Sequence, residues 1–189
     1  MHLILASASP RRAELLESAG YSFDVAPSNV DEAVRDGEDP RAYALRVARD
    51  KAAVAFAQCR KSGSVVLAAD TVVVAAGQIL PKPDGPHDTK RMLKTLSNGV
   101  HEVHTAVVVR AGAREVSDVV TSRVRLLPLS DSEIDWYIET GEPEGKAGGY
   151  AIQGRAARFI DWLEGSWSNV VGLPISTVYT LLNEVGERD

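Results

Sequence analysis

The sequence predicts an α/β fold built on a mixed, twisted sheet with flanking helices. Residues 3–25 give a strand, helix, strand pattern, which is a βαβ unit. Residues 40–61 carry apolar side chains at spacings of three and four, as an amphipathic helix does. Residues 101–127 contain two long strand patterns joined by a short turn. Helices interleaved with paired strands are typical of the α/β class.

The first 40 residues contain a strand, a helix, a second strand and a loop. Apolar residues 3–5 predict a short buried strand. The helix expected over 10–19 starts with a proline, which suits a first turn, and stops at Gly20, which suits the position after a helix end. Residues 21–25 alternate as a strand should, and residues 27–40, rich in acids, Asn and Gly, predict a loop.

The same signals continue along the rest of the chain. Ser130 and Glu133 are spaced as a capping box, which marks the start of a helix. The further elements expected are a helix over 40–61, strand segments 65–69 and 72–76 on either side of Asp70-Thr71, a return strand 78–80, a helix 87–97, strands 101–110 and 115–127, a helix from Ser130 to about Gly141, a strand 158–163 and a last helix from Pro174. Because no repeat or linker interrupts the pattern, residues 1–189 are expected to form a single domain.

Composition excludes several classes of protein. The chain has 189 residues, 44% of them hydrophobic and 25% charged, with a net charge of −5, as is ordinary for a soluble globular protein. Its basic residues are dispersed, so a nucleic-acid polymer is not expected as a partner. A single cysteine, Cys59, excludes an internal disulfide. With neither a signal peptide nor 18 consecutive apolar residues, the expected location is cytoplasmic, with no membrane partner.

Three short segments carry the candidate chemistry. In residues 6–12, two arginines stand at a helix N-terminus, where backbone N–H groups and guanidinium donors suit phosphate oxygens, although a serine-capped, solvated helix start is the alternative. Asp70 interrupts an apolar run, which is costly unless the carboxylate is paired or bound to metal. Residues 146–154 place three glycines around Gln153, which predicts a backbone that closely approaches another group.

Further charged residues have both a functional and an ordinary interpretation. Asp31 and Glu32 are either metal ligands or part of a solvated acidic loop, and Lys51 is either a site residue or a surface lysine. Lys82 lies between two prolines that restrict its backbone, so its side chain can be aimed.

Six motifs in this order resemble the Maf family of nucleoside triphosphate pyrophosphatases. They are SxSPRR with ELL from Ser7, the pair Asp31-Glu32, Lys51, AADT ending at Thr71, LPKP over 80–83 and KAGGYAIQG over 146–154. The resemblance covers nearly the whole chain. It implies two lobes flanking a cleft, similar to inosine triphosphate pyrophosphatases, and it allows a homodimer.

The resemblance also implies an activity and a set of site residues. The expected reaction is hydrolysis of dTTP, UTP or modified pyrimidine nucleotides to monophosphate and pyrophosphate, a house-cleaning role in the nucleotide pool. The alternative function is that of a nucleotide-binding regulator of cell division or septum formation. The implied catalytic residues are Asp70 as proton acceptor, Glu32, Lys51 and Lys82, and the implied substrate-binding residues are Ser7, Ser9, Arg11, Arg12, Thr71 and Gln153.

A divalent cation, Mg²⁺ or Mn²⁺, is the expected cofactor. Asp70 and Glu32, with Asp31 less directly, are its expected ligands, because hard oxygen donors suit these ions and a bound cation acidifies water. No clustered cysteines or histidines point to zinc.

The Gln153 amide offers a donor and an acceptor that match the edge of uracil or thymine.

Overall fold

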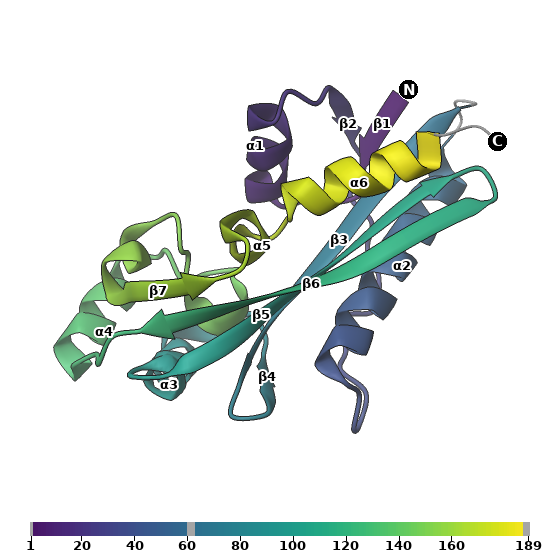
Figure 1. Ribbon diagram of the computed structural model, residues 1–189. Helices are drawn as coiled ribbons and strands as arrows, with labels where there is room; N and C mark the ends of the chain where they lie inside the picture. The colour runs from purple at the N-terminus through teal and green to yellow at the C-terminus, as the bar shows by residue number, and fades with distance from the viewer. Residues whose placement is uncertain (1, 60–62, 187–189) are drawn as a thin grey trace. The chain divides into compact units, whose positions relative to one another are not determined.

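The computed structural model describes residues 2–59 and 63–186, and over these residues it shows seven strands in one sheet (Figure 1). The strand order is β2-β1-β3-β5-β6-β7, and β4 pairs with β3. The strands are β1 (His2–Leu5), β2 (Phe23–Val25), β3 (Ser64–Ala75), β4 (Gln78–Leu80), β5 (Val100–Ala111), β6 (Arg114–Leu126) and β7 (Ile160–Glu164). The helices are α1 (Pro10–Ser18), α2 (Pro40–Gln58), α3 (Gly85–Leu96), α4 (Asp131–Glu139), α5 (Trp167–Val171) and α6 (Ile175–Gly186), with short 3₁₀ turns η1 (Ala147–Gly149) and η2 (Arg155–Phe159).

The sheet is mixed, as the sequence predicts. β1 pairs in parallel with both β2 and β3, so that Leu5 lies opposite Val25 on one side and Leu67 on the other. β4 runs antiparallel to β3, and β7 runs antiparallel to β6. The predicted α/β class with a mixed sheet and flanking helices is therefore confirmed.

The chain divides into two compact units. Unit 1 contains the residues up to Asp70, Thr105–Val120 and the residues from Gly172 onward, and unit 2 contains Thr71–His104 and Thr121–Val171. Strands β3, β5 and β6 contribute residues to both units. The expected cleft and the assignment of 1–189 as a single domain stay predictions.

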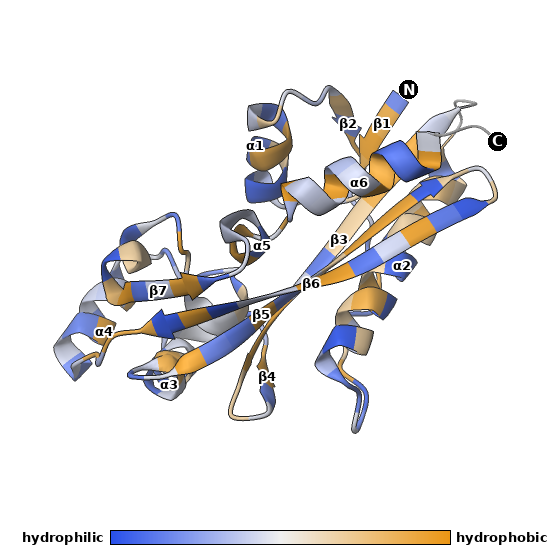
Figure 2. Ribbon diagram, in the orientation of Figure 1, coloured by the Kyte–Doolittle hydropathy of each residue, from blue (hydrophilic) through white to orange (hydrophobic). Residues whose placement is uncertain are grey.

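Unit 1 has an aliphatic core. Figure 2 shows hydrophobic positions along β1 and β3, and these pack with one face of α6, where Val178, Leu181 and Leu182 follow the three-and-four spacing of an amphipathic helix. Leu5 and Leu16 are completely buried, and burial of such a side chain stabilises the fold by roughly 1.5–3 kcal/mol. α1 and α6 are thereby fixed against the strands of their own unit.

Unit 2 has an aromatic cluster around α4. The Tyr137 ring meets the Phe159 ring edge-to-face at a centroid distance of 5.9 Å, and Trp136 meets Phe159 at 6.2 Å. The predicted capping box is confirmed: the Ser130 hydroxyl accepts from the Glu133 backbone N–H, and the Glu133 carboxylate accepts from the Ser130 backbone N–H.

Several predicted boundaries differ from those in the structure, and three of them are instructive. β3 runs without a break through Asp70 and Thr71, because pairing with Lys51 offsets the cost of a carboxylate in a buried strand. α2 ends at Gln58, and the last residues of the predicted helix, 60–61, lie outside the described residues. Residues 158–159, predicted as the start of a strand, lie instead at the end of the 3₁₀ turn η2, since Phe159 packs in the aromatic cluster and Arg158 lies over the Trp136 ring.

None of the described helices is long and apolar enough to cross a membrane.

Candidate active site

Lys51 joins the two carboxylates that the sequence singles out. Its Nζ lies 2.8 Å from Asp70 Oδ1 and 2.6 Å from Glu32 Oε1. Lys51 and Asp70 are only 8% exposed, whereas the Glu32 side chain keeps 37% of its surface exposed. The interpretation of Lys51 as a surface lysine is therefore wrong, and Glu32 gives the cluster a side open to solvent.

A helix and a strand position Lys51 and Asp70. Asp70 lies within β3, next to the buried Ala69, and Lys51 lies in the middle of α2. The start of α2 is fixed by Asp39, whose carboxylate accepts from the backbone N–H groups of Arg41 and Ala42, and by the proline at its first position. Because strand and helix are both rigid, the Lys51 to Asp70 contact is held without the help of a loop.

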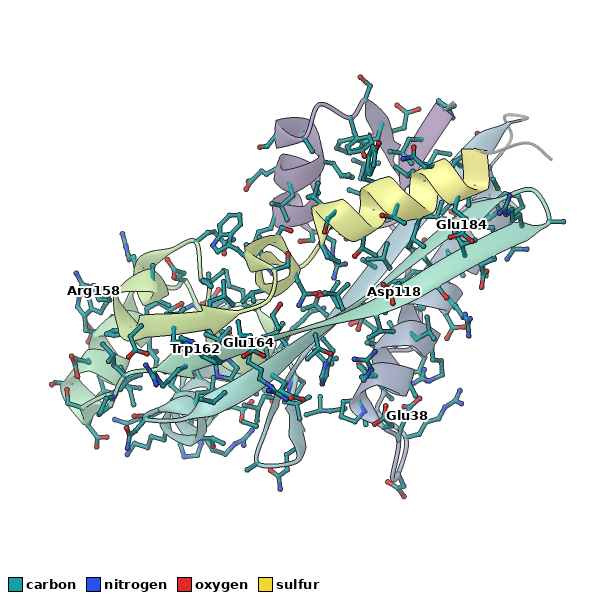
Figure 3. All side chains as sticks on the ribbon, in the orientation of Figure 1. Glu38, Asp118, Arg158, Trp162, Glu164 and Glu184 are labelled. Carbon is teal, nitrogen blue, oxygen red and sulfur yellow. The ribbon has the colours of Figure 1, made fainter. Side chains whose placement is uncertain are left out.

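The acidic loop that carries Glu32 is fastened to α2. The Tyr43 hydroxyl donates to the Glu32 carbonyl at 2.8 Å, and Arg46 donates to the Ala33 carbonyl at 3.0 Å. Arg46 also binds both oxygens of Glu38, which lies just before α2 (Figure 3) and whose pKa is lowered to about 2, mainly by this hydrogen bond. Burial, followed by the charges of Asp70 and Glu32, raises the pKa of Tyr43 to about 12, so its hydroxyl stays a donor.

The carboxylate of Asp31, the residue before Glu32, makes a different contact. Its carboxylate accepts from the backbone N–H of Ala33 at 2.9 Å, which forms a local turn, and the residue is exposed. The structure therefore brings Glu32, and not Asp31, onto Lys51.

Arg12 is buried, and its side chain connects the start of α1 to other parts of unit 1. Its Nε donates to the Gly172 carbonyl at 2.8 Å, and its Nη1 donates to the Ala69 carbonyl at 2.8 Å and to Ser7 Oγ at 3.1 Å. Burial lowers the pKa of this guanidinium, and the nearby charge of Asp70 opposes that change. Arg12 thus ties the start of α1 to β3 one residue before Asp70, a role that the sequence pattern did not indicate.

The start of α1 differs from a serine-capped, solvated helix end. Ser9 occupies the capping position, but its side chain makes no capping hydrogen bond, and the Ser9 backbone N–H donates instead to Ser7 Oγ at 3.2 Å. Arg11 is half-buried, and its pKa is lowered by burial, with Glu14 opposing. The structure therefore places Ser7, Ser9 and Arg11 together at a helix N-terminus, where backbone N–H groups favour anions.

Unit 2 holds the other predicted site residues. Lys82 and Gln153 are exposed, and Thr71 is half-buried in β3. The segments carrying Lys82 and Gln153 are linked within this unit, because the backbone N–H of Gly148 donates to the Pro81 carbonyl at 3.1 Å.

The close approach predicted for the glycine-rich segment exists, but at Gly148 it is made to protein. Gly148 has φ +70°, and a Cβ there would lie 2.9 Å from the side chain of Val73. No larger residue fits this position without displacing a valine of β3.

The carboxylate pair offers hard oxygen donors of the kind that Mg²⁺ and Mn²⁺ prefer. Over the described residues, no three His, Cys, Asp or Glu side chains are grouped as a metal site. Asp70 and Glu32 meet at one positive point, the Lys51 ammonium. One or two carboxylates, completed by water and substrate phosphates, are the usual surroundings of Mg²⁺, so these residues can hold such an ion.

A family comparison gives this geometry a context. The family described as Maf-like protein matches residues 2–185. The chain belongs to the Maf family. Two curated relatives of this Maf chain, from Anaeromyxobacter sp. strain Fw109-5 and Koribacter versatilis, are 50% and 47% identical to it. The alignments cover 97% and 98% of this chain and 89% and 95% of the relatives, and both relatives are named dTTP/UTP pyrophosphatase.

The fold of the Maf chain also occurs in a solved structure. A HAM1 protein from Coxiella burnetii aligns with a TM-score of 0.51 and 15% identity, over 97% of this chain and 99% of that one. At this identity the likeness shows the fold alone.

Sequence reasoning missed the residues that hold the site of the Maf chain in place. Tyr43 and Arg46 fasten the acidic loop, and neither belongs to a recognised motif. The one signal that could have found them is their spacing: they lie three residues apart on α2, at the end nearest in sequence to that loop.

Proposed function

We propose that this Maf chain hydrolyses nucleoside triphosphates, dTTP and UTP first among them and modified pyrimidine nucleotides as a further class, to monophosphate and pyrophosphate. The observation that carries the proposal is the Lys51 ammonium held between Glu32 and Asp70. The names of the curated relatives give the substrate class. The role is removal of unwanted nucleotides from the pool.

The residues of unit 1 have distinct tasks in this proposal. Ser7, Ser9 and Arg11 bind phosphate oxygens at the start of α1. Asp70 accepts a proton from the attacking water. The water oxygen bonds to the α-phosphorus, and the bond from the α-phosphorus to the oxygen that bridges to the β-phosphate breaks. Lys51 orients both carboxylates, and its charge stabilises the charge that moves onto the departing pyrophosphate.

The proposed cofactor is Mg²⁺ or Mn²⁺, held by Asp70 and Glu32. When bound, such an ion neutralises phosphate charge and acidifies a water molecule. The fastening of the Glu32 loop by Tyr43 supports this assignment, because a ligand on a fixed backbone is already in position before the ion arrives.

Lys82, Thr71 and Gln153, which belong to unit 2, have the remaining roles in this proposal. Lys82 is assigned to the polyphosphate tail, and Gln153, with Thr71 and Arg12, to the choice of base. The exposed Gln153 amide can donate to a carbonyl and accept from the N3–H of a uracil or thymine ring. Convergence of these residues with the unit 1 cluster stays a prediction, as do a homodimer and a cytoplasmic location.

Replacement of Gln153 is expected to change selectivity more than stability. Since Gln153 is exposed, Gln153→Ala should leave the melting temperature within about 2 °C of the wild-type value. Loss of the amide should lower the preference for dTTP and UTP over GTP by about 10-fold. Steady-state kinetics with the three nucleotides measure this ratio, and an unchanged ranking would remove Gln153 from base selection.

The experiment that tests the proposed function is a panel of nucleoside triphosphates with Mg²⁺, Mn²⁺ or EDTA, assayed separately for pyrophosphate and orthophosphate. Pyrophosphate release from dTTP and UTP, lost in EDTA, is the expected result. Orthophosphate release would identify a different phosphatase. Nucleotide binding without turnover would favour the alternative of a nucleotide-binding regulator of cell division.

A further inference from the structure

Tyr137, near the end of α4, and Glu142, just after that helix, form a polar pair in which Tyr137 is buried and Glu142 is half-buried. Tyr137 is completely buried, and its hydroxyl donates to Glu142 Oε1 at 2.8 Å. Burial, together with the hydrogen bond to Glu142, raises the pKa of Tyr137, so the hydroxyl stays protonated. Neither residue belongs to the set of candidate site residues described above.

The pair holds the backbone on both sides of Gln153. The backbone N–H of Ala151, two residues before Gln153, donates to the Tyr137 hydroxyl at 3.2 Å. On the other side, the backbone N–H groups of Arg155 and Ala156 donate to the Glu142 carboxylate at 2.8 and 3.2 Å. One network therefore spans the short segment that contains the exposed Gln153.

The fit between this segment and Glu142 is close. A Cβ on Gly154 would meet the Glu142 carboxylate, so a larger residue here would displace that side chain from its present position. The two backbone hydrogen bonds from Arg155 and Ala156 help to lower the pKa of Glu142 despite its partial burial. An ionised carboxylate only accepts hydrogen bonds, and it meets three donors here.

A second contact supports the same segment from β5. His101 Nε2 lies 2.7 Å from the Tyr150 hydroxyl, and the two rings meet edge-to-face. Burial lowers the pKa of His101 to about 4, so its ring is neutral at neutral pH. Tyr150 is thus fixed, and the segment after it starts from a defined position.

We propose that Tyr137 and Glu142 are positioning residues for nucleobase selection, which they determine by holding the backbone that presents Gln153. This inference rests on the proposed function, because it assigns the pair to the base end of the same substrate. The pair does not touch the substrate in this proposal and acts only through Gln153.

The chemistry explains why a carboxylate and a phenol occupy these positions. An amide at position 142 would turn an N–H₂ group toward one of the donors that the carboxylate satisfies. A phenylalanine at position 137 would keep the ring in the aromatic cluster but leave the Ala151 N–H without its acceptor. Both changes release the Gln153 segment while preserving side-chain volume.

The test uses Glu142→Gln and Tyr137→Phe, with Glu133→Gln as the matched control. Glu133 is the other carboxylate that accepts backbone N–H at an end of α4, but its partner is Ser130. For Glu142→Gln and Tyr137→Phe we expect KM for dTTP to rise about 10-fold, kcat to stay within about 2-fold, and the preference for dTTP over GTP to fall about 10-fold. Glu133→Gln should leave this preference unchanged.

A double variant separates positioning from general weakening. If Glu142 acts through Gln153, adding Glu142→Gln to Gln153→Ala should change the nucleotide preference no further. Additive losses would overturn the proposal, as would an unchanged preference in both single variants. Loss of the folded state in both single variants, seen in thermal melting, would also overturn it, because the pair would then hold unit 2 together rather than position one residue.

Failure of the proposed function would look different. In that case the wild-type chain itself would release no pyrophosphate from dTTP or UTP. Calorimetry with non-hydrolysable analogues of dTTP and GTP would then still test the role of Tyr137 and Glu142. We expect their replacement to lower the affinity for the dTTP analogue relative to the GTP analogue by the same factor.

Discussion

Asp70→Asn should reduce kcat for dTTP by about 1000-fold while the protein stays folded. The amide is close in shape to the carboxylate, but it cannot accept a proton at neutral pH. Folding is expected to survive because Lys51 keeps Glu32 as a partner. Pyrophosphate release under saturating dTTP and Mg²⁺ measures the effect, and circular dichroism measures the fold.

Asp161→Asn is the matched control for this change. Asp161 is also a carboxylate in a strand, but it lies on β7 and pairs with Arg125, away from the Lys51 cluster in sequence and in bonding. Its replacement should leave turnover at the wild-type level. Turnover of Asp70→Asn within a few fold of wild type would remove Asp70 as the proton acceptor.

Lys51→Met should produce the largest loss of stability among these variants. Methionine replaces the lysine stem with little change in length but leaves Glu32 and Asp70 without their shared cation. Removal of one partner from a buried ion pair is costly, and because Glu32 keeps one open side we expect a loss of roughly 2–4 kcal/mol in the free energy of unfolding. Urea denaturation at neutral pH measures it.

The control for Lys51→Met is Lys90→Met, which removes an exposed ion pair with Asp135 and should lower the stability far less than Lys51→Met does. Mg²⁺ adds a second readout. If the two carboxylates hold the divalent cation, Mg²⁺ should raise the melting temperature of Lys51→Met more than that of the wild type. Equal stability of Lys51→Met and wild type would show that the shared cation is not needed.

Local patterns were sufficient to predict most of the elements. The Ser130 capping box, the turn at Gly20 and the spacing of Val178, Leu181 and Leu182 depend on neighbours a few residues away, and all appear in the structure as expected. Each of these signals arises from interactions between residues that are close in sequence, so a short stretch of chain is enough to recognise it.

Two features that the sequence did not predict share one physical cause, which is pairing between residues far apart in the sequence. Asp70 was expected to interrupt a strand, but its partner Lys51 lies 19 positions earlier on another element. The sequence also did not indicate that Arg12 donates to the Gly172 carbonyl, 160 positions later; its role at the substrate stays a prediction. Every residue has a backbone carbonyl, so no sequence motif can indicate which carbonyl will accept a hydrogen bond.

The candidate site was predicted in part for the same reason. The motifs named Glu32, Lys51 and Asp70, and the structure joins these three. The motifs did not name Tyr43, whose hydroxyl fixes the backbone that carries Glu32. Residues that bind through side-chain charge are visible in a sequence, whereas residues that hold a backbone in place are not.

The most direct test of the central claim is hydrolysis of dTTP with Mg²⁺ in water enriched in ¹⁸O, followed by mass spectrometry of the products. The account predicts unlabelled pyrophosphate and one ¹⁸O in the phosphate of dTMP, because water attacks the α-phosphorus beside Asp70. Label in orthophosphate or in pyrophosphate would place the attack on another phosphorus and contradict the account.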